Sequence, residues 1–422
     1  MLSDMIQNYF KRFKKSRGSN KIFKNAIIYS IGNYSSKFIA IIVFPIVVTY
    51  LGLEDTGKLD LIVSTVTILA TIFSLQIGEA VYRWFSTNDL AEQQISFSNG
   101  IVVLVIMVML CTVLYVLGYF FYTFPKDLWT LSYFILVSHI VLNAFFQIIR
   151  GLGKVTVFTV VGIIKSILYT AASLLVAIFT QDKLYNVLLA LLLSNIIGII
   201  LTIYHFDFIK FYRHAEVTIL NLKKLIKYSV PLIINALSWI SFFAVNKYII
   251  LYNLELDDNG IFAVAEKIAI GIFFIGMFYY YSLQDHCLSS NNFRQEGAFF
   301  KKIVLRTILM VISSILLLQL TLWIVMPILF PNLVISLNYL PFLAFANLFI
   351  VLSSYLGIPY NYKKKTISMA ITSLAGLTLT LVLSMILVSS FGLYGVCTAI
   401  LIGAVLVFLI RLKYNITFFK TE

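Results

Sequence analysis

Long apolar segments alternate with short polar connections along almost the whole chain. A helix needs about 20 mainly apolar residues to cross the hydrocarbon core of a membrane, and twelve segments meet this requirement. The pattern predicts an all-α integral membrane protein. We expect membrane-spanning helices near residues 24–51, 59–79, 97–121, 130–149, 155–180, 184–206, 225–252, 260–283, 302–326, 337–357, 366–390 and 393–412.

The two halves of the chain share parts of this pattern. A shift of 203 residues places the segment LEDTG (53–57) on LDDNG (256–260), and a shift of 209 places LYNV (184–187) on LYGV (393–396). Six helices return the chain to the side where it started, so two six-helix repeats would be related by a pseudo-two-fold axis along the membrane normal. Transporters built in this way bind their substrate between the halves.

These repeats predict three parts of the chain. Residues 1–206 form an N-terminal six-helix bundle that is preceded by a basic arm, and residues 225–422 form a C-terminal six-helix bundle. Residues 207–224 form a cytoplasmic linker between the two bundles.

Composition supports a membrane protein. Of the 422 residues, 60% are hydrophobic and only 12% are charged, whereas roughly 25% are charged in a soluble domain. The first apolar segment follows a basic arm without a signal-peptide cleavage site, so we expect the first helix to be retained. Three cysteines, an odd number lying mostly in apolar runs, predict no disulfide framework.

The basic residues are distributed unequally between the two sides of the predicted membrane. Apart from four lysines inside predicted spans, all Lys and Arg residues except Lys58, Lys126 and Lys183 fall at the two termini, in loops after even-numbered helices, or at the adjoining ends of spans, where Arg411 lies. The positive-inside rule places this side, with both termini, in the cytoplasm. Sidedness accounts for most of the net charge of +14, so we expect no nucleic-acid partner.

Four lysines lie inside predicted spans: Lys37, Lys165, Lys247 and Lys267. A charge at the bilayer centre costs on the order of 3 kcal/mol unless it faces a bundle interior or a water-filled cavity. Lys37 and Lys165 lie too deep to reach the interface, so we expect them to line a cavity. Lys247 and Lys267 lie nearer the outer ends of their helices, and there snorkelling to water is an equal alternative.

Further polar residues share helix faces with these lysines. Asn33 is one turn before Lys37, His139 and Asn143 are one turn apart in the fourth span, and Asn235 lies in the seventh. We consider Asn33, His139, Asn143 and Asn235 substrate-binding candidates together with the four lysines. For each Asn, a hydrogen bond between helices explains the residue equally well.

The sign of the interior charge predicts the class of ligand. The carboxylates in the spans are few, namely Asp60 and Glu79 near the ends of the second span and Glu266 in the eighth. A cationic interior attracts an anion and repels a cationic drug. Lysine binds phosphate as a point charge, so a phosphate-bearing anion fits this interior.

Basic residues at the predicted cytoplasmic ends suggest an entrance. We expect Arg83, Arg150, Lys363 and Lys364 to steer an anionic head group into the protein. For the YKKKT motif (362–366), a role as a topology signal remains an equal interpretation.

Three segments resemble a known family. RGLGKVTVFTVVGIIKSI (150–167), YKKKT (362–366) and FGLYGVCTAILIGAVL (391–406) resemble polysaccharide flippases of the Wzx type. These belong to the multidrug/oligosaccharidyl-lipid/polysaccharide exporter (MOP) superfamily, and the likeness extends over essentially the whole chain. One departure is that the seventh helix has Asn246 before Lys247 where many relatives have an acidic residue before a basic one.

This resemblance implies a fold, a cargo and a location. It implies two six-helix bundles in a MATE-like V shape that work by alternating access. The cargo would be a polyprenyl-diphosphate-linked oligosaccharide, an O-antigen or capsule repeat unit, moved from the cytoplasmic to the outer leaflet of the bacterial cytoplasmic (inner) membrane. Membrane lipids, a polysaccharide polymerase and other assembly proteins are the implied partners.

Two alternative functions remain. One is a multidrug or cation exporter of the same superfamily, which we would expect to place carboxylates in its cavity. The other is a membrane glycosyltransferase or polymerase, with LEDTG (53–57) and LDDNG (256–260) as metal ligands, although such sequences are also ordinary turn formers. The sequence contains no nucleophile elbow, phosphate loop or zinc spacing, so we predict no enzyme, cofactor or metal.

Overall fold

The computed structural model describes residues 41, 43–85, 89–121, 125–213, 217–280, 283–284, 287, 297–363 and 365–420. Throughout these ranges the regular elements are helices, which confirms the all-α prediction. The first half contains α3 (Leu53–Phe73), α4 (Ile77–Phe85), α5 (Leu90–Phe121), α6 (Lys126–Gly151), α7 (Val155–Phe179), α8 (Lys183–Tyr204) and the short α9 (Phe208–Phe211).

The second half begins with the long helix α10 (Ile219–Asn253). It continues with α11 (Leu256–Gly276), α13 (Gly297–Leu329), the 3₁₀ helix η3 (Pro331–Asn338), α14 (Leu340–Leu356), α15 (Ile358–Tyr362) and α16 (Thr366–Lys420). We call α3–α8 the N-lobe and α11–α16 the C-lobe.

Ten helices of the described residues are long and apolar enough to cross a membrane, so this is a multi-pass membrane protein. The helix α16 contains non-helical backbone at Gly392, where φ is 55°, and it corresponds to the two predicted spans 366–390 and 393–412. The first predicted span, 24–51, lies mainly outside the described residues. A total of twelve spans therefore stays a prediction.

The predicted second span, 59–79, is divided into α3 and α4. The backbone between them is left-handed at two residues that are not glycine, Leu75 (φ 46°) and Gln76 (φ 51°). The side-chain oxygen of Ser74 accepts a hydrogen bond of 3.2 Å from the backbone N–H of Gln76. This break separates α4 from α3, and strained backbone of this kind persists only where the surroundings hold it in place.

The corresponding helix of the second half is interrupted at the same position. Under the 203-residue shift, the bounds of α3 coincide with those of α11, and a turn follows both helices. The helix α11 therefore ends at Gly276, before the end of the predicted span 260–283. The matching bounds show that the likeness between the halves extends from sequence to helix limits.

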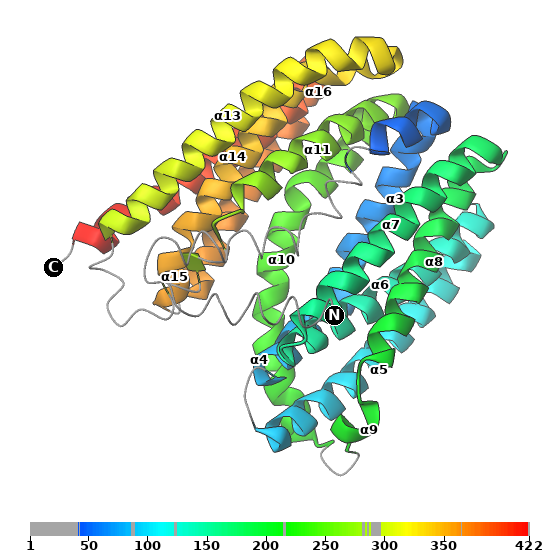
Figure 1. The fold of residues 1–422 in the computed structure, drawn as a ribbon, viewed down its shortest axis with the longest axis vertical. Coiled ribbons are helices and arrows are strands. Elements are labelled where there is room, and N and C mark those ends of the chain that lie inside the picture. The colour runs from blue at the N-terminus through cyan, green and yellow to red at the C-terminus, as the bar shows by residue number, and fades with distance from the viewer. Residues whose placement is uncertain are drawn as a thin grey trace, which may run out of the picture.

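The two lobes converge at one end and separate toward the other (Figure 1). They meet where α3 and α11 begin, and they lie apart where α4 and α15 are found. We call the meeting point the joined end and the other the opposite end.

Two glycines explain the close approach at the joined end. A Cβ atom at Gly57 would collide with the carbonyl oxygen of Leu256, and a Cβ at Gly260 would collide with that of Leu53. These contacts are reciprocal under the 203-residue shift, as a two-fold axis between the segments requires. The two segments thus lie in the first turns of helices and not in the turns that their composition suggests, and their glycines permit a helix crossing.

The helix α10 packs on both lobes. Near its start, Leu225 lies in the N-lobe core with Ile77 and Ile135. Near its end, Ile250 lies in the C-lobe core with Phe262 and others. Pro231 lies inside the helix between these contacts. The boundaries at residues 206 and 224 stay predictions, but the first turns of α10 pack with the N-lobe.

One basic residue of the predicted cytoplasmic side is buried. Arg411 is only 1% exposed, and its guanidinium donates to Ser353 O (2.8 Å), Thr372 Oγ1 (2.9 Å) and Ser373 Oγ (2.7 Å) inside the C-lobe. It also lies over the ring of Trp239, with 5.4 Å from Cζ to the ring centroid. The basic residues that the sequence assigns to the cytoplasmic side therefore include one that is buried and joins α14 to α16.

Candidate functional site

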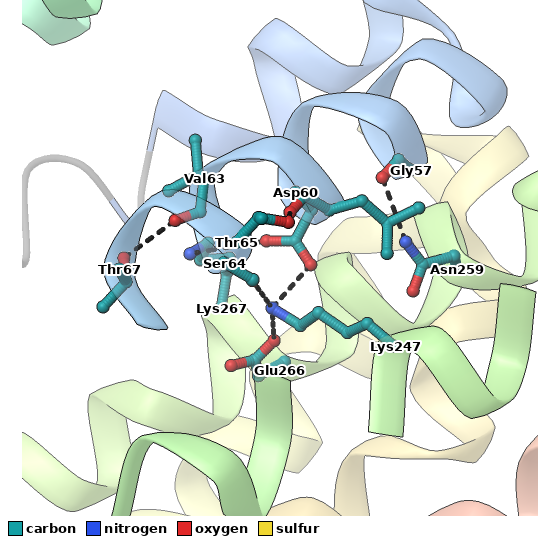
Figure 2. Close-up of polar contacts among 11 residues, drawn as sticks. Gly57, Asp60, Val63, Ser64, Thr65, Thr67, Lys247, Asn259, Glu266 and Lys267 are labelled. Carbon is teal, nitrogen blue, oxygen red and sulfur yellow. Dashed lines mark hydrogen bonds and ion pairs between the residues drawn. The ribbon is translucent and has the colours of Figure 1, made fainter. Parts of the chain in front are cut away.

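A cluster of charged side chains joins the lobes near the joined end (Figure 2). The ammonium nitrogen of Lys247 on α10 lies 2.7 Å from Asp60 Oδ2 on α3 and 2.7 Å from Glu266 Oε2 on α11. It also donates to Ser64 Oγ at 2.9 Å. Lys267 lies farther away, with its Nζ 3.8 Å from Asp60 Oδ1. We call these five residues the interlobe cluster.

The interlobe cluster contains two carboxylates and two ammonium groups, so its formal charge is balanced. Lys247 is 2% exposed, which means that its side chain does not snorkel to water. Burying an ion pair is tolerated when geometry is good and the remaining polar atoms are bonded. Lys247 therefore has its charge compensated by protein groups, whereas the side chain of Lys267 is 37% exposed and accessible to a ligand.

The carboxylate Asp60 is placed differently from the sequence-based expectation. We expected it at the end of a span beginning near residue 59, but α3 begins at Leu53. Asp60 thus lies in the second turn and is 4% exposed. Glu266 likewise pairs with Lys247 instead of its neighbour Lys267, as adjacent helical residues point in different directions. The interior is consequently less cationic here than the sequence suggests.

Further contacts reinforce the joined end. The amide of Asn259 on α11 donates to the carbonyl oxygen of Gly57 at 3.0 Å, and the hydroxyls of Thr65 and Tyr248 are hydrogen-bonded to each other. Residues 43–51 are helical, and they contribute Val48 to the C-lobe core. The joined end is therefore closed by ion pairs, hydrogen bonds and close helix packing together.

Lys165 lies inside the N-lobe. Its side-chain Cδ would lie 3.8 Å from a Cβ placed on Gly198 of α8, and its charge acts electrostatically on His139 of α6. Both side chains are half-buried. The side chain of Lys165 thus extends from α7 toward Gly198 of α8 and interacts with His139 of α6. Asn143, one turn beyond His139, is exposed.

Several predicted site residues are not described. Lys37, Asn33 and Lys364 lie outside the described residues, as does the side chain of Asn235. Their roles stay predictions. Lys363 is described, and its Nζ lies 4.9 Å from the ring centroid of Phe418 in the C-lobe.

A pocket of about 580 Å³ lies between α4 and α10, with one residue of α5 in its lining. We call it the α4–α10 pocket. Arg83 is part of its lining, and the guanidinium carbon lies 5.4 Å from the ring centroid of Tyr228. The pocket is lined by Glu79, Tyr82, Arg83, Trp84, Glu92, Tyr228 and Leu232.

Of the predicted entrance residues, Arg83 lines this pocket, and Arg150 contacts Tyr82, which is one of its lining residues. Arg150 lies 4.7 Å from the ring centroid of Tyr82 and donates to Gln147, which in turn donates to Glu79 at 2.7 Å. Lys363 lies in the C-lobe instead. Sequence reasoning missed Trp84 and Tyr228, because a single aromatic in an aromatic-rich membrane protein is more often part of the lipid-facing surface.

Comparisons with known proteins agree on the family and fold. A family model described as "Polysaccharide biosynthesis protein" matches residues 22–284, more than half of the chain. No curated protein matches the sequence.

Solved structures of MATE transporters have a similar fold. An inward-facing multidrug resistance MATE family transporter of the MOP superfamily is 16% identical, with a TM-score of 0.63 over 94% of this chain and 99% of that one. An outward-facing one is 16% identical, with a TM-score of 0.57 over 95% and 97%. A MATE in a straight conformation is 16% identical, with a TM-score of 0.60 over 95% and 97%.

Proposed function

Because the chain belongs to the polysaccharide biosynthesis protein family and has the fold of MATE transporters, we propose that it is a flippase for a lipid-linked oligosaccharide. Its cargo is a polyprenyl-diphosphate-linked O-antigen or capsule repeat unit. The protein moves this cargo from the cytoplasmic to the outer leaflet of the bacterial inner membrane by alternating access. Family and fold are both of the transporter type, as a non-enzymatic role requires.

The observation that carries this proposal is the contrast between the two ends of the lobes. The joined end is closed by the interlobe cluster and by the crossing at Gly57 and Gly260, while the lobes lie apart at the opposite end (Figure 1), where α4 forms part of the α4–α10 pocket. The positive-inside assignment makes the joined end the outer one. On this assignment the lobes separate toward the cytoplasm (Figure 1).

Charge favours an anionic cargo over the cationic drug of the alternative function. Lys165 is half-buried beside His139 without a carboxylate in its described contacts, and Lys267 keeps an exposed ammonium group. Such cations attract a diphosphate and repel a cationic drug. Together with Lys37, Asn33, Asn143 and Asn235, they form the proposed substrate-binding set.

Transport in vesicles tests the proposal. We expect vesicles containing the purified protein to flip a fluorescent polyprenyl diphosphate that carries a short oligosaccharide. Lys165→Ala and Lys267→Ala should each slow transport about tenfold, the effect of losing about 1.4 kcal/mol of head-group binding. The matched control is Lys302→Ala, which removes an exposed ammonium from α13. Export of a cationic dye without movement of the glycolipid would instead identify a multidrug exporter.

A further inference from the structure

The α4–α10 pocket combines aromatic, basic and acidic side chains. Trp84 and Tyr228 form an edge-to-face pair, with ring centroids 5.4 Å apart and an interplanar angle of 77°. Aromatic rings provide flat apolar surfaces with a polar edge, a combination suited to the carbon–hydrogen face of a sugar ring. The volume of about 580 Å³ is in the range of small-molecule sites.

Cations surround these aromatic rings. The guanidinium carbon of Arg83 lies 5.4 Å from the Tyr228 ring centroid, and Lys224 Nζ lies 5.6 Å from that of Trp84. Both cations are on exposed residues. Arginine binds phosphate oxygens in a bidentate manner and lysine binds them as a point charge. The aromatic pair is thus flanked by two groups that suit a diphosphate.

Two carboxylates make the pocket unsuited to a simple anion. Glu79 and Glu92 both line it, and an ionised carboxylate accepts hydrogen bonds only. Sugar hydroxyls can donate to these carboxylates, whereas the negative charge of inorganic diphosphate is repelled by them. The mixture of acids, bases and aromatic rings therefore matches a glycosylated diphosphate better than a bare phosphate or an apolar molecule.

The pocket also lies where the chain changes from one lobe to the other. Its walls Tyr228 and Leu232 flank Pro231, near the point where α10 passes from the N-lobe core to the C-lobe core. The other wall, α4, follows the left-handed break at Leu75 and Gln76. A ligand in this pocket contacts segments on both sides of the proline.

From these observations we infer that the α4–α10 pocket is a docking subsite for the sugar diphosphate head group of the cargo. The sugar next to the diphosphate packs on Trp84 and Tyr228, its hydroxyls donate to Glu79 and Glu92, and Arg83 and Lys224 bind the diphosphate. This inference rests on the proposed function and deepens it by giving the cargo a first binding position before it reaches Lys165.

Binding to the purified full-length protein in detergent tests the inference. The probes are a polyprenyl diphosphate carrying one N-acetylhexosamine, the same lipid without sugar, and inorganic diphosphate. Trp84→Leu and Tyr228→Leu should weaken binding of the sugar-bearing probe about tenfold and change binding of the unglycosylated lipid less than about twofold, because stacking contributes only when a sugar is present. Arg83→Gln and Lys224→Gln should weaken binding of both lipids to a similar extent.

Two variants on α13 serve as matched controls. Trp323→Leu removes a tryptophan that is 70% exposed, and Lys302→Gln neutralises an exposed lysine. Both should bind all probes like the wild type.

A labelling measurement tests the same pocket without the four substitutions, in case those variants fold poorly. Leu232→Cys places a thiol in the pocket, and the three native cysteines are buried. The sugar-bearing probe should slow maleimide labelling at residue 232, whereas inorganic diphosphate should not. Unchanged labelling with a saturating probe would overturn the inference.

The outcomes separate the inference from the proposed function. If the wild type binds and flips the glycolipid and the four pocket variants behave like it, the subsite is wrong and the flippase function remains. If the wild type neither binds nor flips the glycolipid, the proposed function itself fails.

Discussion

The ammonium nitrogen of Lys247 on α10 lies 2.7 Å from Asp60 Oδ2 on α3 and 2.7 Å from Glu266 Oε2 on α11. Lys247 is therefore the shared partner of two carboxylates that reach it from different lobes. Because all three residues are buried, their mutual contacts replace the hydration that they lose. Opening the joined end in an alternating-access cycle would require these contacts to separate.

The first prediction concerns the loss of Lys247. The variant Lys247→Met leaves Asp60 and Glu266 without their shared cation, and breaking a buried pair in this way costs about 3–5 kcal/mol. We expect a clearly lower unfolding temperature in detergent. Lys302→Met, on an exposed site of α13, is the control. Adding Asp60→Asn to Lys247→Met should recover part of the loss, and a double variant less stable than the single one would contradict the arrangement.

A second prediction concerns the helix crossing at the joined end. Gly57→Val and Gly260→Val each place atoms against a backbone carbonyl of the other lobe, and overpacking of this kind costs about 1–3 kcal/mol. The matched control is Gly162→Val in α7, where nothing lies within 4 Å of an added Cβ. In thermal unfolding, Gly57→Val and Gly260→Val should each lower the unfolding temperature, and Gly162→Val should leave it nearly unchanged.

The two glycines also allow a test of the reciprocal contact. Since they occupy equivalent positions in the two halves, their substitutions should have similar effects. A large effect at one of them and a negligible effect at the other would contradict a two-fold relation between α3 and α11.

A third prediction concerns the buried Arg411. Its Ala variant removes hydrogen bonds to Ser353, Thr372 and Ser373, and hydrogen bonds to charged groups contribute about 1.5–3 kcal/mol each. We expect Arg411→Ala to lower the unfolding temperature and Arg411→Lys to recover only part of the loss, because an ammonium group lacks the guanidinium fork. The neighbouring Lys413→Ala, at an exposed position, should have little effect.

A fourth prediction concerns the direction of transport. Carrying one negative charge outward yields about 2.3 kcal/mol per 100 mV when the cell interior is negative. Vesicles with a clamped potential should therefore flip the diphosphate-linked oligosaccharide faster at the physiological polarity than at the reverse polarity. An ionophore that abolishes the potential provides the control. Equal rates at both polarities would contradict net movement of negative charge.

The sequence predicts the spans well, because about 20 apolar residues in a row have few other uses. It also predicts that residues 53–57 and 256–260 are equivalent in the two halves, since their acidic and glycine positions repeat, but the contact between the two segments is seen only in the structure. The break at Leu75 and Gln76 is missed for a physical reason: neither residue is glycine or proline, and the left-handed backbone is imposed by the surrounding structure.

The candidate site is less predictable than the fold. Lys165 and His139 are identified by their position within helices, and the structure brings them together. The pairing of Lys247 with Asp60 depends on contacts between residues that are 187 positions apart, and no local pattern encodes it. Trp84 and Tyr228 become recognisable only when α4 and α10 are seen to form one pocket.

The position of Arg411 after all three of its partners in the sequence has a consequence for biogenesis. The atoms that accept its hydrogen bonds, on Ser353, Thr372 and Ser373, are synthesised earlier, so they wait in the bilayer for the guanidinium to arrive. The helical segment after Gly392 carries this cation near its end, where a long basic side chain can reach the interface while the helix enters the membrane. Insertion of this segment, and not of any earlier helix, therefore sets the moment at which α14 and the two parts of α16 can pack together.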